Sequence, residues 1–318
     1  ALIVLLSTLA YTLYGGLRVS IFTDNIQMIV IGILLLVSFI YINKTIGTDF
    51  SFNFVKKNNP QLLSSSYMPG YTAGLTFFIA VAATNLFHQG NWQRIYAAKN
   101  FDTLKKSLIL SFLIIVPIVF LMGFTGLVAY SIDSTIRPDL GFFSLLLKEQ
   151  TIILSLIIII LGLALTISTI DTLINAISSL IVVDGKAIFK FKHKVNYLNF
   201  SKYTIIILSL ISFFVASKGF DILYLFLLAD LFCCSFVLTV FYSFYNKKIN
   251  ESTAYLSIII GLIGGFLLFP TPDFSKSLLV GILIPKELFV PFISQQLLFL
   301  SFVVATFLPF FILKAKKV

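Results

Sequence analysis

Residues 163–184, LALTISTIDTLINAISSLIVVD, carry the polar groups that are best placed for chemistry in this chain. Five of its polar residues, Ser168, Asp171, Thr172, Asn175 and Ser179, share one helical face, with Thr169 and Ser178 at its edge. Counted from the first of the five, the other four follow at three, four, seven and eleven positions, which is helical spacing. Most of the remaining positions are Leu, Ile, Val or Ala. The stretch therefore predicts an apolar helix with one polar stripe.

The chemistry of this stripe depends on the solvent around the helix. In water the apolar side would pack in a core and the stripe would face solvent. In a bilayer the stripe has to face protein or a water-filled cavity. A charged Asp near the centre of a spanning helix costs roughly 2.5–3.5 kcal/mol on insertion scales. Such residues typically mark an ion or substrate path, so we expect function to lie along this stripe.

Composition identifies the solvent. The chain has 318 residues, of which 58% are hydrophobic and 11% charged, and its mean hydropathy is +1.02. A soluble domain carries about 25% charged residues. Several apolar stretches approach the ~20 residues that cross a bilayer. The sequence predicts an all-α, polytopic membrane helix bundle embedded in lipid. The net charge of +10 is explained by basic loops between spans, so no nucleic-acid partner is expected.

Enzymatic chemistry has no support in the sequence. No His-Glu-x-x-His or nucleophile motif is present, so we expect no catalytic residues. Cys233 and Cys234 are adjacent in an apolar run, without disulfide or metal-ligand spacing, and are interpreted as packing residues. No obligate protein partner is evident.

We expect a single transmembrane domain over residues 1–318 with about nine spanning helices. The expected spans are residues 1–14, 25–43, 70–89, 107–130, 151–183, 202–217, 221–245, 252–270 and 289–313. Gly15 and Gly16 are expected to interrupt the helix between the first two spans. The opening ALIVLLSTLAYTLY resembles the second half of a span, so we expect earlier helices to be missing from this sequence.

The basic residues predict the orientation. With nine spans, 15 of the 23 Lys and Arg residues fall on one side of the membrane. The positive-inside rule makes that side cytoplasmic, together with the C-terminus, in a plasma or inner membrane. Lys190 and Lys316 are then cytoplasmic, and Lys56 is external.

The third expected span changes character near its end. It is apolar from Phe77 to Ala83 and continues as TNLFHQGNWQRIYAAKN. One interpretation is that the helix has reached the interface, where Trp and polar residues gather and Arg94 and Lys99 anchor it. The other is that this segment lines a solute pathway. The pathway residues would be Asn85, His88, Gln89 and Trp92.

Three stretches resemble the sodium:solute symporter family, which includes transporters of sugars, proline, pantothenate and urea. YGGLRVSIFTDNIQ is similar to a Tyr-x-x-x-Gly-Gly turn followed by Thr-Asp-x-x-Gln. NWQRIYAAKN is similar to the family's Gln-Arg-x-x-Ala-Ala-Lys segment, and STIDTLINAISS to its Ser-Thr-x-Asp-Ser pattern. All three occur in order over essentially the whole chain. The segment around Trp92 is nearer to the urea-type members.

The resemblance implies a LeuT-like fold of two inverted five-helix repeats. On this alignment the chain starts in core helix four, contains helices five to ten and continues through two more. Core helices one to three would be absent. In the family the broken first helix supplies part of the ion and substrate sites, so this chain by itself is not expected to transport.

The resemblance also implies Na⁺ ligands. Ser168 and Thr169 would give their hydroxyl oxygens, and Leu165 its backbone carbonyl, which suits a hard cation that prefers oxygen. Judged from the residues alone, the two hydroxyls could equally hydrogen-bond back to their own helix. Asp171 and Asn175 are expected to support the site.

Two further acids lie in predicted spans or at their ends. By resemblance, Asp24 would guide Na⁺ as it leaves, whereas the residues alone also allow it to cap a helix entry. Asp230 is an intramembrane acid on the span 221–245, and its partner cannot be named from the sequence.

The resulting prediction is sodium-coupled symport of a small polar organic solute by alternating access. Two alternatives remain. One is an uncoupled facilitator or channel, which would keep the polar pathway but not depend on sodium. The other is a membrane sensor input domain, because symporter-like bundles can be fused to signalling modules.

Overall fold

The computed structural model describes residues 2–137, 140–148, 151–189, 196–246, 249–274, 276–283 and 291–315. These residues form α-helices joined by loops and short 3-10 turns, and they contain no strand beyond one isolated bridge between Pro270 and Ser277. The predicted all-α polytopic bundle is confirmed. Lys190 and Lys316, which the orientation prediction uses, lie outside the described residues.

In the described part of the chain, eight helices are long and apolar enough to cross a membrane. They span Gly15–Asp49, Met68–Phe87, Phe101–Ile132, Ile152–Gly185, Asn199–Ala216, Ile222–Tyr245, Glu251–Leu268 and Gln295–Ala315. A shorter apolar helix, Leu2–Leu13, precedes them. The helices overlap all nine expected ranges, and the number of crossings stays a prediction.

The chain folds into two compact units. Unit 1 comprises Ala1–Ser65 and Gln89–Lys218, and unit 2 comprises Ser66–His88 and Gly219–Val318. Each unit is therefore built from two segments that are far apart in the sequence.

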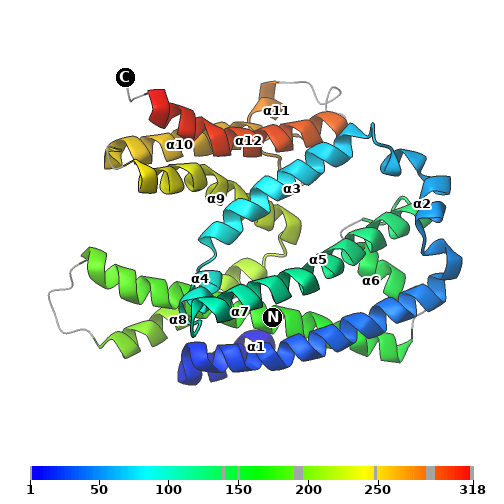
Figure 1. Ribbon diagram of the computed structural model, residues 1–318, viewed down its shortest axis with the longest axis horizontal. Helices are drawn as coiled ribbons and strands as arrows, with labels where there is room; N and C mark the ends of the chain where they lie inside the picture. Colours follow the sequence, from blue (N-terminus) through cyan, green and yellow to red (C-terminus); the bar gives the residue numbers. More distant parts are fainter. Residues whose placement is uncertain are drawn as a thin grey trace. The chain divides into compact units, whose positions relative to one another are not determined.

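Unit 1 is organised around the contact of α1 with α7. Its helices are α1 (Leu2–Ile46), α2 (Phe52–Asn58), α4 (Gln89–Tyr96), α5 (Phe101–Ile132), α6 (Gly141–Leu146), α7 (Ile152–Phe189) and α8 (Tyr197–Ala216). Two 3-10 turns, Gly47–Asp49 and Pro60–Leu63, flank α2. Helix α1 runs along α7, and α8 packs beside α7 (Figure 1).

Gly16 divides α1 into two arms. Its backbone has φ 52° and ψ −145°, a conformation that residues with a Cβ rarely adopt. The expected break at these glycines is present, but helical conformation resumes at once. Asp24 therefore lies inside the second arm, and its alternative interpretation as a helix-entry cap is wrong. A single glycine of positive φ redirects the chain, so no capped loop is needed.

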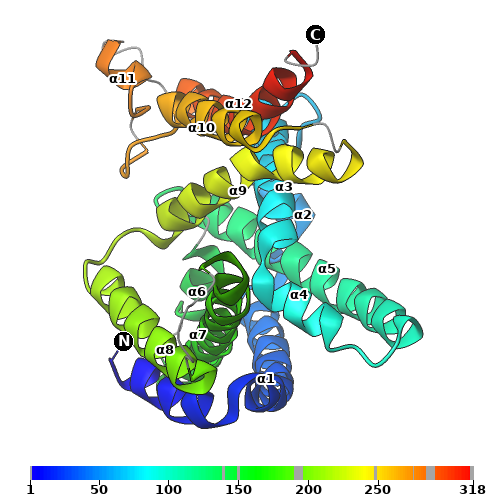
Figure 2. The same cartoon turned by 90° about the vertical axis from the view of Figure 1, so that its left-hand side faces the viewer.

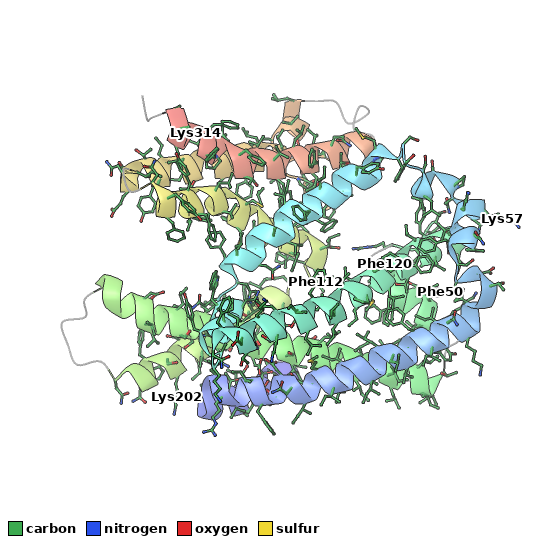
Figure 3. The ribbon with its side chains drawn as sticks, viewed as in Figure 1. Phe50, Lys57, Phe112, Phe120, Lys202 and Lys314 are labelled. Atoms are coloured by element: carbon green, nitrogen blue, oxygen red, sulfur yellow. The ribbon has the colours of Figure 1, made fainter. Side chains whose placement is uncertain are left out.

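The packed core of unit 1 lies where α2, α5 and α6 meet α1 and α7. Ile42, Val55, Val128, Leu146 and Leu161 have no exposed area there. Phe50 precedes α2 and Phe120 lies on α5, at the same end of the unit (Figure 3). Lys57 lies at that end and Lys202 at the opposite one (Figure 3).

Unit 2 is a bundle of α3 (Met68–Phe87), α9 (Ile222–Tyr245), α10 (Glu251–Leu268), the short α11 (Val280–Leu283) and α12 (Pro291–Ala315). Helices α10 and α12 lie side by side (Figure 2), and α12 also packs on α9 and α3. A Cβ on Gly261 would lie 2.3 Å from Pro309 Cγ. Small residues at such a contact let two membrane helices approach closely.

Candidate functional site

The predicted polar stripe is present on α7 and faces protein. Asp171 has no exposed area, and Asn175 and Ser178 are buried. On the other side of the helix, Leu165 and Ile177 are more than a third exposed. This one-sided burial is the arrangement expected for a polar stripe in a lipid-embedded helix.

Asp171 joins both arms of α1 to α7. Tyr11, on the first arm, donates a hydrogen bond of 2.8 Å to Oδ2. Thr23, on the second arm, donates to the same oxygen at 3.3 Å. Thr172 donates to Oδ1 at 3.2 Å. The kink at Gly16 allows a single carboxylate to lie close to both arms. Tyr11 and Thr172 replace part of the water that an ionised Asp would otherwise need, whereas the one hydrogen of Thr23 is shared with the nearer carbonyls of Ser20 at 2.9 Å and Val19 at 3.0 Å.

Asp24 is the second acid of the network. Its Oδ2 forms an ion pair with Arg94 of α4, and its Oδ1 accepts a hydrogen bond of 2.8 Å from Ser168 of α7. Arg94 also donates to Thr172 at 2.9 Å. The two acids are therefore linked through Arg94 and Thr172. The ion pair is partly exposed, with side-chain exposures of 35% for Arg94 and 19% for Asp24.

The network continues along α7 toward its C-terminal end. Gln93 of α4 donates to Ser179, and Ser178 shares a 2.8 Å hydrogen bond with Ser201 of α8. Asn175 lies between these contacts, and its buried Nδ2 has no hydrogen-bond partner among the described residues. An unpaired buried donor of this kind costs about 1–3 kcal/mol, so this position is open to a further acceptor.

The three proposed Na⁺ ligands lie within one turn of α7. Thr169 is exposed and donates to the Leu165 carbonyl at 2.9 Å, which is the back-bonding that the residues alone allowed. Ser168 instead donates to Asp24. Each hydroxyl has one hydrogen and two acceptor lone pairs, so both oxygens remain able to coordinate a cation. The set of hard oxygens beside a carboxylate fits Na⁺, although the roles of these residues stay predictions.

The proposed solute-pathway residues flank a break between two helices. Helix α3 ends at Phe87, His88 leaves the helical conformation with ψ 98°, and α4 begins at Gln89. Asn85 is exposed and donates to Val81 O at 2.8 Å. Trp92 is half-buried and lies 6.2 Å from Tyr96 between ring centroids.

These four residues are divided between the units. Asn85 and His88 belong to unit 2, and Gln89 and Trp92 to unit 1.

Sequence reasoning missed four members of the network. Arg94 fits an interfacial anchor from its position alone, and the predicted site includes none of Tyr11, Gln93 and Ser201. The Gln-Arg pair within NWQRIYAAKN was the available signal for α4. The signal for Tyr11 was the Tyr-x-x-x-Gly-Gly pattern that ends at Gly15 and Gly16, but nothing local indicates its partner Asp171, which is 160 residues away.

A cavity of about 700 Å³ also lies in unit 1, between α1, α7 and α8. Its lining is apolar, with Leu5, Ile170, Ile174 and Phe213 among its walls. Such a lining offers few partners to an ion or a polar solute, so the cavity is distinct from the polar network.

The model of the sodium:solute symporter family matches residues 1–261, which is most of the chain. A spermidine transporter of Candida albicans (strain SC5314 / ATCC MYA-2876) is 28% identical over 237 residues, which cover 74% of this chain and 44% of that protein. The chain thus spans less than half of that relative's length. No solved structure matches the chain. The chain belongs to the sodium:solute symporter family.

Proposed function

We propose that the protein couples the entry of Na⁺ to the transport of a small polar solute by alternating access. The ligands from this chain are the Ser168 and Thr169 hydroxyls and the Leu165 carbonyl. The observation that carries the proposal is the hydrogen bond from Ser168 to Asp24, because it places a carboxylate directly beside one of these oxygens.

The charge of the network supports a monovalent cation. Asp24 and Asp171 contribute two negative charges when ionised, and Arg94 contributes one positive charge. One negative charge is left without a partner among these three groups. In a low-dielectric surrounding a net charge of this kind attracts a single cation strongly.

The arrangement also offers a means of coupling. Na⁺ that enters down the membrane potential gains roughly 2.3 kcal/mol per 100 mV. To use this energy, the ion has to bind one conformation more tightly than another. The Ser168–Asp24 hydrogen bond joins α7 to the second arm of α1. An ion that binds the Ser168 hydroxyl therefore alters a contact between these two helices.

Polar groups beside the helix break are the proposed solute contacts. Asn85, His88, Gln89 and Trp92 offer amide, imidazole and indole groups for a polar molecule. Spermidine is the first solute to test, because a relative is named as its transporter. Urea is the second, because the segment around Trp92 resembles the urea-type members.

The test uses the full-length protein reconstituted in liposomes. Uptake of labelled spermidine and urea is compared in sodium and in potassium buffers of equal ionic strength, with an inside-negative potential. Symport predicts uptake that depends on sodium and rises with the potential. Uptake that is equal in the two buffers would overturn sodium coupling and favour an uncoupled facilitator.

Sodium binding is measured independently of the solute. Thermal unfolding of the detergent-solubilised protein is followed as sodium replaces potassium. Since a ligand that binds only the folded state stabilises it by mass action, a sodium-specific rise in the unfolding temperature is expected. An unfolding temperature that does not distinguish the two cations would contradict the site.

A further inference from the structure

Unit 2 contains a buried acid that the sodium network does not use. Asp230 lies within α9 and has no exposed area. Its Oδ1 is hydrogen-bonded to Thr84 of α3. Thr84 is thus the partner that the sequence could not name.

The hydrogen atoms around Thr84 indicate the charge state of Asp230. The Thr84 hydroxyl has one hydrogen but two oxygen neighbours, Asp230 Oδ1 and the Ala80 carbonyl at 3.0 Å. If Asp230 is ionised, the hydroxyl can donate to only one of them. If Oδ1 carries a proton, Asp230 donates to Thr84 and Thr84 donates to Ala80, so both contacts are hydrogen bonds.

The second oxygen of Asp230 points to the same state. Oδ2 is buried and has no hydrogen-bond partner among the described residues. Asp24 has an arginine on one oxygen and Ser168 on the other, and Asp171 accepts from Tyr11 on Oδ2 and from Thr172 on Oδ1. Asp230 has neither form of compensation. An ionised carboxylate in a spanning helix without such partners is costly, whereas a neutral acid costs much less.

Within the described part of the chain, the groups around Asp230 supply no opposite charge. On α9 its electrostatic neighbours are the thiols of Cys233 and Cys234. The helices that pack on α9 are α3, α10 and α12. Their described titratable groups, with His88 after α3, lie in or next to end turns: Tyr71, His88, Glu251, Tyr255 and Lys314. Tyr224, Tyr242 and Tyr245 lie near the ends of α9 itself.

We propose that Asp230, together with Thr84, is a proton-binding site of this transporter, separate from the sodium site. In the arrangement described here the acid is protonated. When α3 and α9 separate, water reaches the carboxyl group, which releases its proton to water and becomes a carboxylate. Protonation therefore favours the closed α3–α9 contact, and raising the pH favours its opening. The transport cycle gains a pH dependence that does not require the sodium proposal to hold.

The direct test is infrared spectroscopy of the full-length protein in lipid at neutral pH. A protonated carboxylic acid has a carbonyl band that is distinct from the carboxylate bands and shifts in deuterium oxide. We expect this band in the native protein and its loss in Asp230→Asn. The matched controls Asp24→Asn and Asp171→Asn should retain it. Absence of the band, or a band that survives in Asp230→Asn, would overturn the assignment.

A second variant leaves the acid in place. Thr84→Ala removes the hydrogen-bond acceptor, so the band of Asp230 should move to the higher frequency of a more weakly hydrogen-bonded acid. Thr72→Ala is its control, since Thr72 lies on the same helix and donates to Met68 O and Pro69 O. A band that is unchanged in Thr84→Ala would contradict the pairing of the two residues.

Transport supplies the functional readout. Asn at position 230 keeps the shape of the protonated acid and can donate to Thr84, so Asp230→Asn should fold normally. Its uptake of labelled spermidine in constant sodium should lose a pH dependence that the native protein shows. Native uptake with no pH dependence, or an equal dependence in the variant, would contradict a role in the cycle. Neither result would bear on sodium coupling.

Discussion

Ser168 donates a hydrogen bond of 2.8 Å to Asp24, and this contact ties the proposed sodium ligand on α7 to the second arm of α1. The other carboxylate oxygen of Asp24 is paired with Arg94. The electrostatic potential at Ser168 therefore depends on both residues, because Asp24 attracts a cation and Arg94 repels it.

This balance predicts effects of opposite sign for the two partners. Asp24→Asn removes the attraction and should raise the sodium concentration that half-saturates the thermal-shift response, whereas Arg94→Gln should lower it. At an effective dielectric of ~20, a unit charge contributes about 4 kcal/mol at about 4 Å and about 2 kcal/mol at about 8 Å, or roughly 30- to 1000-fold in affinity. Asp102→Asn, at an exposed acid in the first turn of α5, is the control. Shifts of the same sign in both variants would exclude a simple charge balance.

The same pair predicts non-additive stability. Each single change leaves a partly buried charge without its partner, so each should destabilise the protein by about 1–3 kcal/mol. The double variant Asp24→Asn/Arg94→Gln leaves neither charge and should lose less than the sum of the single changes. The stability of the native protein, the two single variants and the double variant is measured by thermal unfolding, which completes the double-mutant cycle. Additive losses would mean that the two side chains do not interact.

Gly16→Ala should be strongly destabilising, because a Cβ is rarely tolerated at φ 52° and ψ −145°. We expect a loss of about 1–3 kcal/mol, in the range of other strained backbone positions. Gly32→Ala is the matched control on the same helix. A Cβ there would have no neighbour within 4 Å, and alanine is the better helix former. An equal response of both variants in thermal unfolding would show that the kink is not held by Gly16.

Helix faces were predictable from the sequence, and helix partners were not. The spacing from Ser168 to Ser179 predicts the buried stripe because it depends only on local geometry. Tyr11 and Asp171 meet across 160 residues, and no local pattern encodes such a contact. For the same reason the sequence could not indicate that Thr84 is the partner of Asp230, because the two residues are 146 positions apart.

Two local features were only partly predicted. The helix break at His88 was hidden by the polar residues around it, which fit an interface equally well. At Gly16 the glycine pair indicated a break, but the sequence did not show that the helix would continue directly through Asp24.

Orientation in the membrane is predicted from the basic residues. Lys57 and Lys202 lie at opposite ends of unit 1 (Figure 3). In a background with Cys233→Ala and Cys234→Ala, single cysteines at positions 56, 190 and 202 are labelled from outside intact cells. Position 56 should react, and positions 190 and 202 should react only after permeabilisation. Labelling of position 190 from outside would reverse the topology.

Thr169→Ala tests the ion site itself in the full-length protein. The change removes one proposed oxygen ligand, and alanine also favours the helix, so folding and insertion should be unaffected. Losing an interaction of about 1.5–3 kcal/mol with a charged group should raise the half-saturating sodium concentration by roughly 10- to 150-fold. The response is read from sodium-dependent uptake and from the sodium-dependent thermal shift.

Thr166→Ala is the matched control for this change. Thr166 is also exposed on α7 and donates to the carbonyl four residues earlier, at 2.7 Å against 2.9 Å for Thr169. The two variants lose the same back-bond and the same area, but only Thr169 is a proposed ligand. Ser178→Ala, which removes the contact with Ser201, should also leave the sodium dependence nearly unchanged. If Thr169→Ala and Thr166→Ala respond to sodium alike, the Thr169 hydroxyl only back-bonds to its helix, and the proposed site loses its second hydroxyl ligand.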